Sequence, residues 1–189
     1  MKAVLAAAAL LCSLATGAAA QPWFTMTTEI DYENCTADAP PYQSTTVYFI
    51  VDLNYFVDAI TAVEFRIAGF PDVPGDVVIT QHWETPLVIG TPGHGIALAF
   101  SPALAGPRCY LGRVEFFVAA ADALGDDYCM EYSESLGSGR LLVVDSEFNE
   151  IDALGDAFVF NPVNWLNCNF CPDIVSAETQ SWSAVKSLY

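Results

Sequence analysis

The sequence predicts an all-β protein, an antiparallel β-sandwich of about nine strands. Three observations support this fold class. Val, Phe, Tyr and Thr are frequent, and these residues favour strands over helices. Short runs of alternating apolar and polar residues recur, and Gly- and Pro-rich turns separate them. No stretch keeps a helical period over more than about three turns. Short strands at regular spacing are typical of a two-layer sandwich.

The strongest strand is predicted at residues 45–53. Val47, Phe49 and Val51 share one face, at the period of two that a half-buried strand requires. The opposite face carries Tyr48 and Asp52, so it is only partly polar. This strand should therefore have one face in the core.

The same parity predicts the remaining strands. Residues 62–68 alternate cleanly, with Val63 and Phe65 facing inward. Residues 57–63 fit either a loop or a short helical turn. Further strands are expected at 26–32, 76–80, 87–89, 95–100, 109–118, 128–132, 140–144 and 157–160. Eight side chains of inward parity should be nearly fully buried: Phe49, Val51, Val63, Phe65, Leu98, Phe100, Val114 and Phe116.

The chain divides into three segments. Residues 1–20 have a positive start at Lys2, an apolar run and a small-residue end at Ala20, which is the pattern of a secretory signal peptide. Residues 21–161 form the predicted sandwich domain. Residues 162–189 form a cysteine-containing tail with a short C-terminal helical turn. We therefore expect a secreted, extracellular or periplasmic protein.

The charge balance excludes some partners. The chain has 6 basic and 23 acidic residues and a formal net charge of −17. Nucleic acid and anionic membrane surfaces would be repelled by this charge. No second apolar run reaches about 18 residues, so we expect no transmembrane segment after cleavage. Cations and basic protein surfaces are favoured.

A family resemblance appears in the order of the strands. The runs 46–51, 60–67, 95–100 and 111–118 resemble the strands of cohesin-like and immunoglobulin-like β-sandwiches. The clearest piece is Ala62-Val63-Glu64-Phe65, which looks like the strand that follows the first long one in cohesin-like modules. The resemblance covers residues 45–160. The chain has no dockerin-type calcium repeat, so the resemblance places it on the receptor side of such a pair.

The C-terminal residues carry a second resemblance. Residues 168–172 and 178–189 are similar to the ending of a group of uncharacterised secreted bacterial proteins, a cysteine pair followed by T-W-x-x-[IV]-K-x-L-Y. Ser181 stands where that pattern has Thr, and Ser183 stands where we expect Gly. The resemblance implies membership of that group and a bacterial exported origin. It implies no chemistry.

Five cysteines remain after removal of the signal peptide: Cys35, Cys109, Cys129, Cys168 and Cys171. In an oxidising compartment four can pair, and one is left over. We expect a bridge between Cys109 and Cys129, and a second one from Cys35 to Cys168 or Cys171. A redox role for the C-x-x-C pair would need a thioredoxin-like helix start, which is absent. A zinc site would need a second such pair.

The sequence contains no recognisable set of catalytic residues. The two histidines, His82 and His94, lack a zinc-ligand spacing, and neither a nucleophile elbow nor a phosphate-binding loop occurs. We name no catalytic residue and expect a protein that is not an enzyme. A carboxylate-dependent, glycosidase-like hydrolase stays the alternative, because sequence alone cannot select a pair from so many acids.

Calcium is the one cofactor that the sequence suggests. Hard cations prefer carboxylate and amide oxygens at short spacing. The EF-hand pattern fails, because Glu150 occupies the place of its Gly. A looser cluster lies at residues 122–127, and a solvated acidic loop or a calcium-stabilised adhesin are both compatible with these residues. The candidate ligands are Asp145, Glu147, Asn149, Asp152 and Asp156.

Three residues are candidates for partner binding. Trp83 is either an exposed stacking platform or part of the core. Trp182 and Lys186 belong to the tail, where an apolar face with one cation would be either a docking element or a frayed end. Taken with the rest, these residues predict a secreted binding or structural module with a protein or carbohydrate partner.

Overall fold

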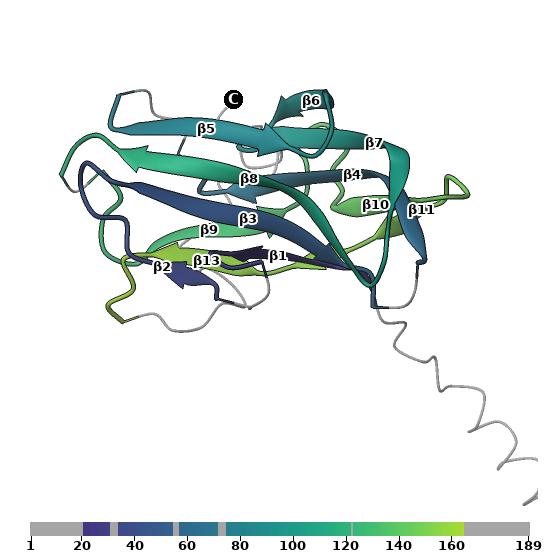
Figure 1. Cartoon of the computed structure of the whole chain (residues 1–189), viewed down its shortest axis with the longest axis horizontal. Coiled ribbons are helices and arrows are strands. Elements are labelled where there is room, and N and C mark those ends of the chain that lie inside the picture. Colours follow the sequence, from purple (N-terminus) through teal and green to yellow (C-terminus); the bar gives the residue numbers. More distant parts are fainter. Residues whose placement is uncertain (1–20, 31–33, 55–56, 72–74, 122, 165–189) are drawn as a thin grey trace, which may run out of the picture.

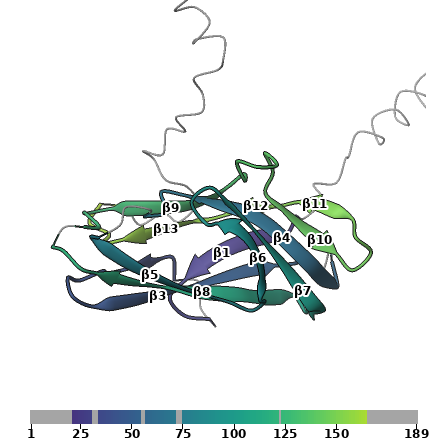
Figure 2. The same ribbon diagram turned by 90° about the horizontal axis from the view of Figure 1, so that it is seen from above.

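The computed structural model describes residues 21–30, 34–54, 57–71, 75–121 and 123–164. Within this part, thirteen strands form two packed layers, and no helix is present (Figures 1 and 2). The predicted all-β sandwich is confirmed. No helix in the described part is long and apolar enough to cross a membrane. The predicted signal peptide and residues 165–189 lie outside the described residues.

The first sheet has the order β12-β1-β3-β8-β5. Its strands β1, β3, β8 and β5 pair antiparallel, and β12 runs parallel to β1. This sheet positions the candidate site. Its strands are β1 (Trp23–Thr27), β3 (Ser44–Asp52), β5 (Val77–Trp83), β8 (Arg108–Val118) and β12 (Leu154–Gly155).

The second sheet has the order β11-β10-β4-β9-β13-β2, and β7 joins β4 to β6 beside that path. All of its pairings are antiparallel except that of β13 with β2. Its strands are β2 (Thr36–Ala37), β4 (Ala59–Ala68), β6 (Leu87–Thr91), β7 (Gly95–Ala105), β9 (Tyr128–Ser133), β10 (Leu142–Asp145), β11 (Glu150–Asp152) and β13 (Ala157–Phe160).

The structure departs from the sequence prediction mainly at the shortest strands. β2, β11 and β12 have two or three residues each, which is too short for a period of two to be recognised. The two parallel pairings both involve such strands, so each sheet is mixed rather than purely antiparallel. β1 begins at Trp23 and ends at Thr27, earlier than predicted, and β4 already begins at Ala59.

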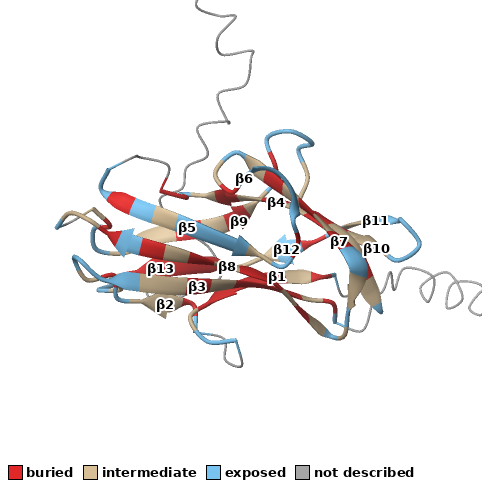
Figure 3. Cartoon of the chain, turned by 45° about the horizontal axis from the view of Figure 1, so that its top comes forward, coloured by how far each residue is buried: buried red, intermediate tan, exposed pale blue. Residues whose placement is uncertain are grey.

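The core lies between the two sheets. All eight side chains predicted to be buried are at most 6% exposed. Their burial confirms the predicted register, because a slip of one residue would turn each of them to the other face. Figure 3 shows buried residues alternating with exposed or half-buried ones along β8. At the centre, the ring of Phe65 lies 5.6 Å from that of Phe24 and 5.3 Å from that of Tyr132.

Candidate functional site

The outer surface of the first sheet carries the strongest candidate site. We call the outward side chains of β5, β8 and β3 the open face. They alternate with core residues, and the three strands lie side by side in Figure 3. The open face comprises Val78, Thr80, His82, Tyr110, Arg113, Glu115, Phe117, Thr46 and Tyr48.

One end of the open face is apolar. Val78 of β5 and Phe117 of β8 lie directly opposite each other, and they are 53% and 37% exposed. Cross-strand neighbours on one face are close enough to act as a single surface. Large apolar side chains left exposed in this way have no role in the core of the sandwich.

The centre of the open face is charged. The Nε atom of Arg113 donates to Oε1 of Glu115 at 3.4 Å, and Nε2 of His82 lies 3.6 Å from the same oxygen. The hydrogen bonds of Arg113 with Glu115 and Tyr110 raise the pKa of the guanidinium. These contacts hold Arg113 along the sheet, with its charge fixed in place.

Two tyrosines lie at the other end. The rings of Tyr48 and Tyr110 are 6.1 Å apart and tilted by 55°. Burial raises the pKa of Tyr110, and the hydrogen bond from Arg113 lowers it in part, so the phenol stays protonated at neutral pH. Beyond them, Nε of Arg108 lies 3.6 Å from Asp52.

A bulge in β8 brings Tyr110 and Arg113 to the same face. Side chains three residues apart normally point to opposite faces of a strand. Here the pairing shifts, so that Gly112 faces Phe49 whereas Tyr110 faces the next residue of β3. One additional residue in β8 therefore resets the alternation. Without this bulge the hydrogen bond between Tyr110 and Arg113 could not form.

The sequence-predicted partner residues lie elsewhere. The ring of Trp83 is 5.3 Å from that of Phe49 and 6.1 Å from that of Phe65, so it packs against the core from the end of β5. We therefore leave Trp83 out of the open face. Trp182 and Lys186 lie outside the described residues.

The structure does not bring the five predicted calcium ligands together. Nδ2 of Asn149 donates to Oδ2 of Asp145 at 2.9 Å, and Oδ1 accepts the backbone N–H groups of Asn149 and Glu147, both at 2.8 Å. These bonds lower the pKa of the carboxyl. Asp152 accepts from Nη2 of Arg140 at 2.8 Å. Glu150 also binds Arg140. In the described ranges, no three His, Cys, Asp or Glu side chains are placed to hold a metal ion.

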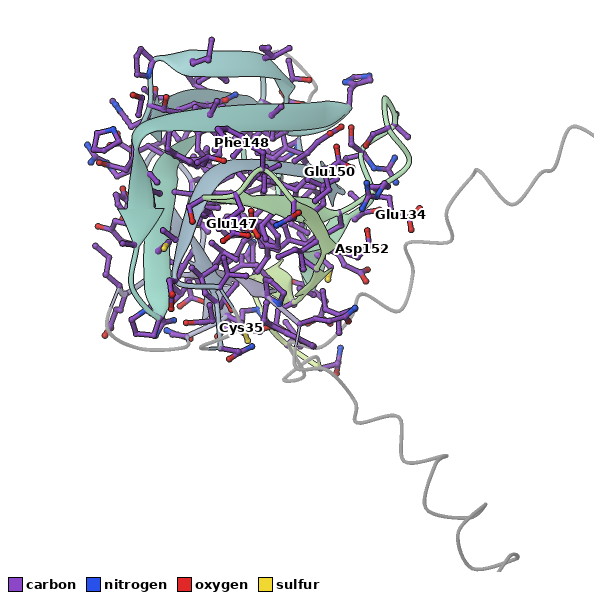
Figure 4. All side chains as sticks on the ribbon, turned by 90° about the vertical axis from the view of Figure 1, so that its right-hand side faces the viewer. Cys35, Glu134, Glu147, Phe148, Glu150 and Asp152 are labelled. Carbon is purple, nitrogen blue, oxygen red and sulfur yellow. The ribbon has the colours of Figure 1, made fainter. Side chains whose placement is uncertain are left out.

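Figure 4 shows these acids at the end of the molecule where β10 and β11 lie. Glu134, Glu150 and Asp152 gather on one side, and Glu147 and Phe148 lie on the hairpin between the two strands. Asp156, the fifth predicted ligand, lies elsewhere and lines a pocket with Asp52. The spacing in sequence suggested one oxygen cage, but the hairpin directs its carboxylates to Arg140 and to its own backbone.

The expected bridge between Cys109 and Cys129 is wrong. Cys109 is a free, buried thiol of β8, whereas Cys129 lies on β9 in the other sheet and is disulfide-bonded. The reason is topological, because Cys109 points into the core from the first sheet, whereas Cys129 pairs with Val159 of β13 and points to the outer surface of the second sheet. Burial, and next the charge of Asp52, raise the pKa of Cys109 to about 11.

Two carboxylates share one concave site, which is what the hydrolase alternative requires. Asp52 and Asp156 line a pocket of about 390 Å³ together with Trp23, Thr25 and Asn54. Asp52 also contacts Arg108. The pocket brings together residues from β1, from the end of β3 and from the segment before β13.

Sequence reasoning missed most of the open face. One signal was present, since Tyr48 and Phe117 are aromatic residues at the outward parity of their strands. Outward-facing apolar side chains indicate a contact surface only when they group into one patch. The grouping itself depends on the pairing of β3, β8 and β5, which are far apart in sequence.

No family model matches the chain, and no curated protein does. Several solved structures are similar to the chain. A chain of the crystal structure of the complex between CaCohA2 and an arginine-to-aspartate variant of CaDoc0917 aligns with a TM-score of 0.50 at 10% identity, over 76% of this chain and 100% of that one. This is a cohesin-like fold.

Two further cohesins are similar. The non-cellulosomal cohesin of the archaeon Archaeoglobus fulgidus aligns at 14% identity with a TM-score of 0.46, over 76% of this chain and 92% of that chain. The third ScaC cohesin of Acetivibrio cellulolyticus, in complex with the ScaB dockerin, aligns at 12% with a TM-score of 0.49, over 76% and 99%. The second resemblance, that of the C-terminal tail, falls outside the described residues and stays a prediction.

Proposed function

We propose that this chain is an extracellular receptor module that binds a protein partner of the dockerin type through the open face. The observation that carries the proposal is the set of outward-facing apolar, charged and aromatic side chains on β5, β8 and β3, of which Val78 and Phe117 are the exposed large apolar ones. The fold supports it, because CaCohA2 has that fold and its structure is a complex with CaDoc0917. Export follows from the predicted signal peptide.

The chemistry of the open face suits a protein contact. Val78 and Phe117 supply apolar area that a partner can bury. Tyr48, Tyr110 and Arg113 are of the residue types that dominate binding energy at interfaces. The neighbouring ion pair holds Arg113 in place before binding, which reduces the entropy lost on association.

The charge distribution favours this face over others. The chain has four arginines. Arg113 belongs to the open face and Arg108 projects from the same strand just beyond it, although the net charge is −17. The open face is therefore less repulsive to an acidic partner than the rest of the surface. We expect the partner to place an apolar residue on Phe117 and an acidic or hydroxyl group near Arg113.

The proposal is tested by calorimetry with the mature chain and a panel of purified dockerin modules that includes CaDoc0917. The double substitution Val78→Ser with Phe117→Ala should weaken binding at least tenfold, because burying these two exposed apolar side chains against a partner is worth more than about 1.4 kcal/mol in total. Phe148→Ala is the matched control, since that ring is 77% exposed on the hairpin between β10 and β11. Equal loss in both variants would contradict the assignment.

A second arm covers partners outside the panel. A photo-reactive amino acid is placed at Phe117 or at Phe148, and the exported proteins of the source cells are presented to each variant. We expect one partner to be captured only from position 117, and capture at 148 alone would overturn the proposed face. Hydrolysis of glycans that Asp52→Asn abolishes would instead favour the hydrolase alternative and its pocket.

A further inference from the structure

Two of the described cysteines carry disulfide bonds, and the third does not. Cys35 and Cys129 are disulfide-bonded, and Cys109 is a free thiol. The partners of Cys35 and Cys129 are therefore each other, or cysteines outside the described residues. The geometry of β13 decides between these possibilities.

Cys35 and Cys129 cannot be bonded to each other. Val159 of β13 pairs with Cys129 of β9 on one side and with Thr36 of β2 on the other. The Cα atoms of Cys129 and Thr36 are thus separated by two strand spacings, about 10 Å, and Cys35 lies one residue beyond Thr36. A disulfide tolerates at most about 7 Å between Cα atoms.

The outer surface of β13 is covered. Phe158 and Phe160 point into the core, so Val159 between them points outward, yet it is 0% exposed. Its neighbours on that surface are the small side chains of Thr36 and Cys129, which are too short to enclose a valine. Among the described strands, the main contacts of β13 are with β9, β2 and β1. Since β1 belongs to the facing sheet, it lies on the core side.

The chain after β13 turns back toward β9. Asn161 has a φ of 52°, and its backbone N–H donates to the carbonyl of Ala37. Oδ1 of Asp127 then accepts the N–H groups of Val163 at 2.7 Å and Asn164 at 3.1 Å. Asp127 directly precedes β9, so residue 164 is held two positions from Cys129. Four more residues reach up to about 14 Å, which is enough to reach either cysteine.

We propose that Cys168 and Cys171 supply both missing partners, one for Cys35 and one for Cys129, so that residues 165–171 dock across the outer surface of β9, β13 and β2. Three residues of extended chain span about 10 Å, which matches the separation of the two sites. Cys12 lies in the predicted signal peptide and is removed. The odd cysteine of the mature chain is then Cys109, and not a member of the C-x-x-C pair.

The bonds form by ordinary oxidation. Each pair of thiols loses two protons and two electrons to a disulfide-carrying oxidant of the exported compartment, which is reduced to a dithiol. The C-x-x-C pair then has a structural role and no redox cycle. The disulfide-bonded segment covers the outer surface of β9, β13 and β2 in the second sheet, and it leaves the open face of the first sheet free.

Peptide mapping without reduction tests the connectivity. The mature chain is purified from an oxidising compartment, denatured, alkylated and digested. Chymotrypsin cleaves after Phe170, between Cys168 and Cys171, so each bond can be assigned separately. We expect Cys35 and Cys129 each linked to one of these two cysteines, with Cys109 alkylated. A bond between Cys168 and Cys171, or a bond to a second molecule, would overturn the proposal.

Substitutions provide the second test. Thiol titration in denaturant should find one thiol in the wild type, none in Cys109→Ser and three in the Cys168→Ser, Cys171→Ser double variant. The double variant should melt roughly 5–15 °C lower than Cys109→Ser, the matched control. Equal melting temperatures would show that residues 165–171 are not anchored by disulfides to the sandwich. Binding through the open face is measured separately, so its failure would leave this connectivity intact.

Discussion

At Gly112 the backbone of β8 takes a φ of 154°, and a Cβ atom added there would stand 2.5 Å from the carbonyl oxygen of His82. Any other residue therefore has to displace the end of β5. We expect Gly112→Ala to lower the free energy of unfolding by roughly 1–3 kcal/mol. The amide resonances of Tyr110 and Arg113 should move with it. If the denaturation midpoint of Gly112→Ala equals that of the wild type, the bulge tolerates a side chain.

Phe65 is the residue on which the core depends most visibly. It is fully buried, and its ring contacts those of Phe24, Phe49, Trp83 and Tyr132. Phe65→Ala should lower the free energy of unfolding by about 3–5 kcal/mol, because it removes apolar burial and leaves a cavity. Denaturant titration measures this. Phe117→Ala is the control of identical chemistry on the open face and should cost less than about 1 kcal/mol.

The titration of the Cys109 thiol should make the free energy of unfolding depend on pH in the alkaline range. Its pKa is raised from 9.0 to about 11, first by burial and second by Asp52. A thiol with a raised pKa in the folded state contributes stability fully below the unfolded pKa, and the contribution is lost as pH rises through the folded value. We expect the wild type to lose stability between pH 9 and 11 relative to Cys109→Ser. Parallel pH slopes of the two proteins would contradict this.

At the scale of elements, the hairpin of β10 and β11 is held by its own contacts. Arg140 donates to Asp152 from both Nε and Nη2, and Asp145 caps the turn through Glu147 and Asn149. These carboxylates are already satisfied without a cation. We expect the melting temperature to be the same in millimolar calcium and in chelator. A fall on chelation would instead support the calcium-stabilised adhesin.

The whole molecule is governed by its charge. A formal net charge of −17 on a chain with few basic residues means that compaction brings many carboxylates together. Raising the salt concentration from 10 mM to 500 mM shortens the Debye length from about 30 Å to a few Å, so repulsion is screened. The melting temperature should rise by several degrees. A fall would show that attractive ion pairs, such as those of Arg140, outweigh the repulsion.

Local pattern was sufficient to predict much of the fold. The alternation in β3 and β4 predicted the burial of Phe49, Val51, Val63 and Phe65, because a period of two is a property of the strand itself. Strands of two or three residues, such as β2 and β12, carry no period and were missed. They exist because a neighbouring strand offers a free edge, which the sequence does not display.

The sequence by itself determined the class of fold, the inward faces of β3, β4 and β7 and the acidic surface. Only the tertiary structure decided which residues meet. It separated Cys109 from Cys129 by placing them in different sheets, and it divided the predicted calcium ligands between a hairpin and a separate pocket. It also assembled the open face from β5, β8 and β3. The physical reason is that side-chain parity is local, whereas strand order and register are settled by packing between segments far apart in the chain.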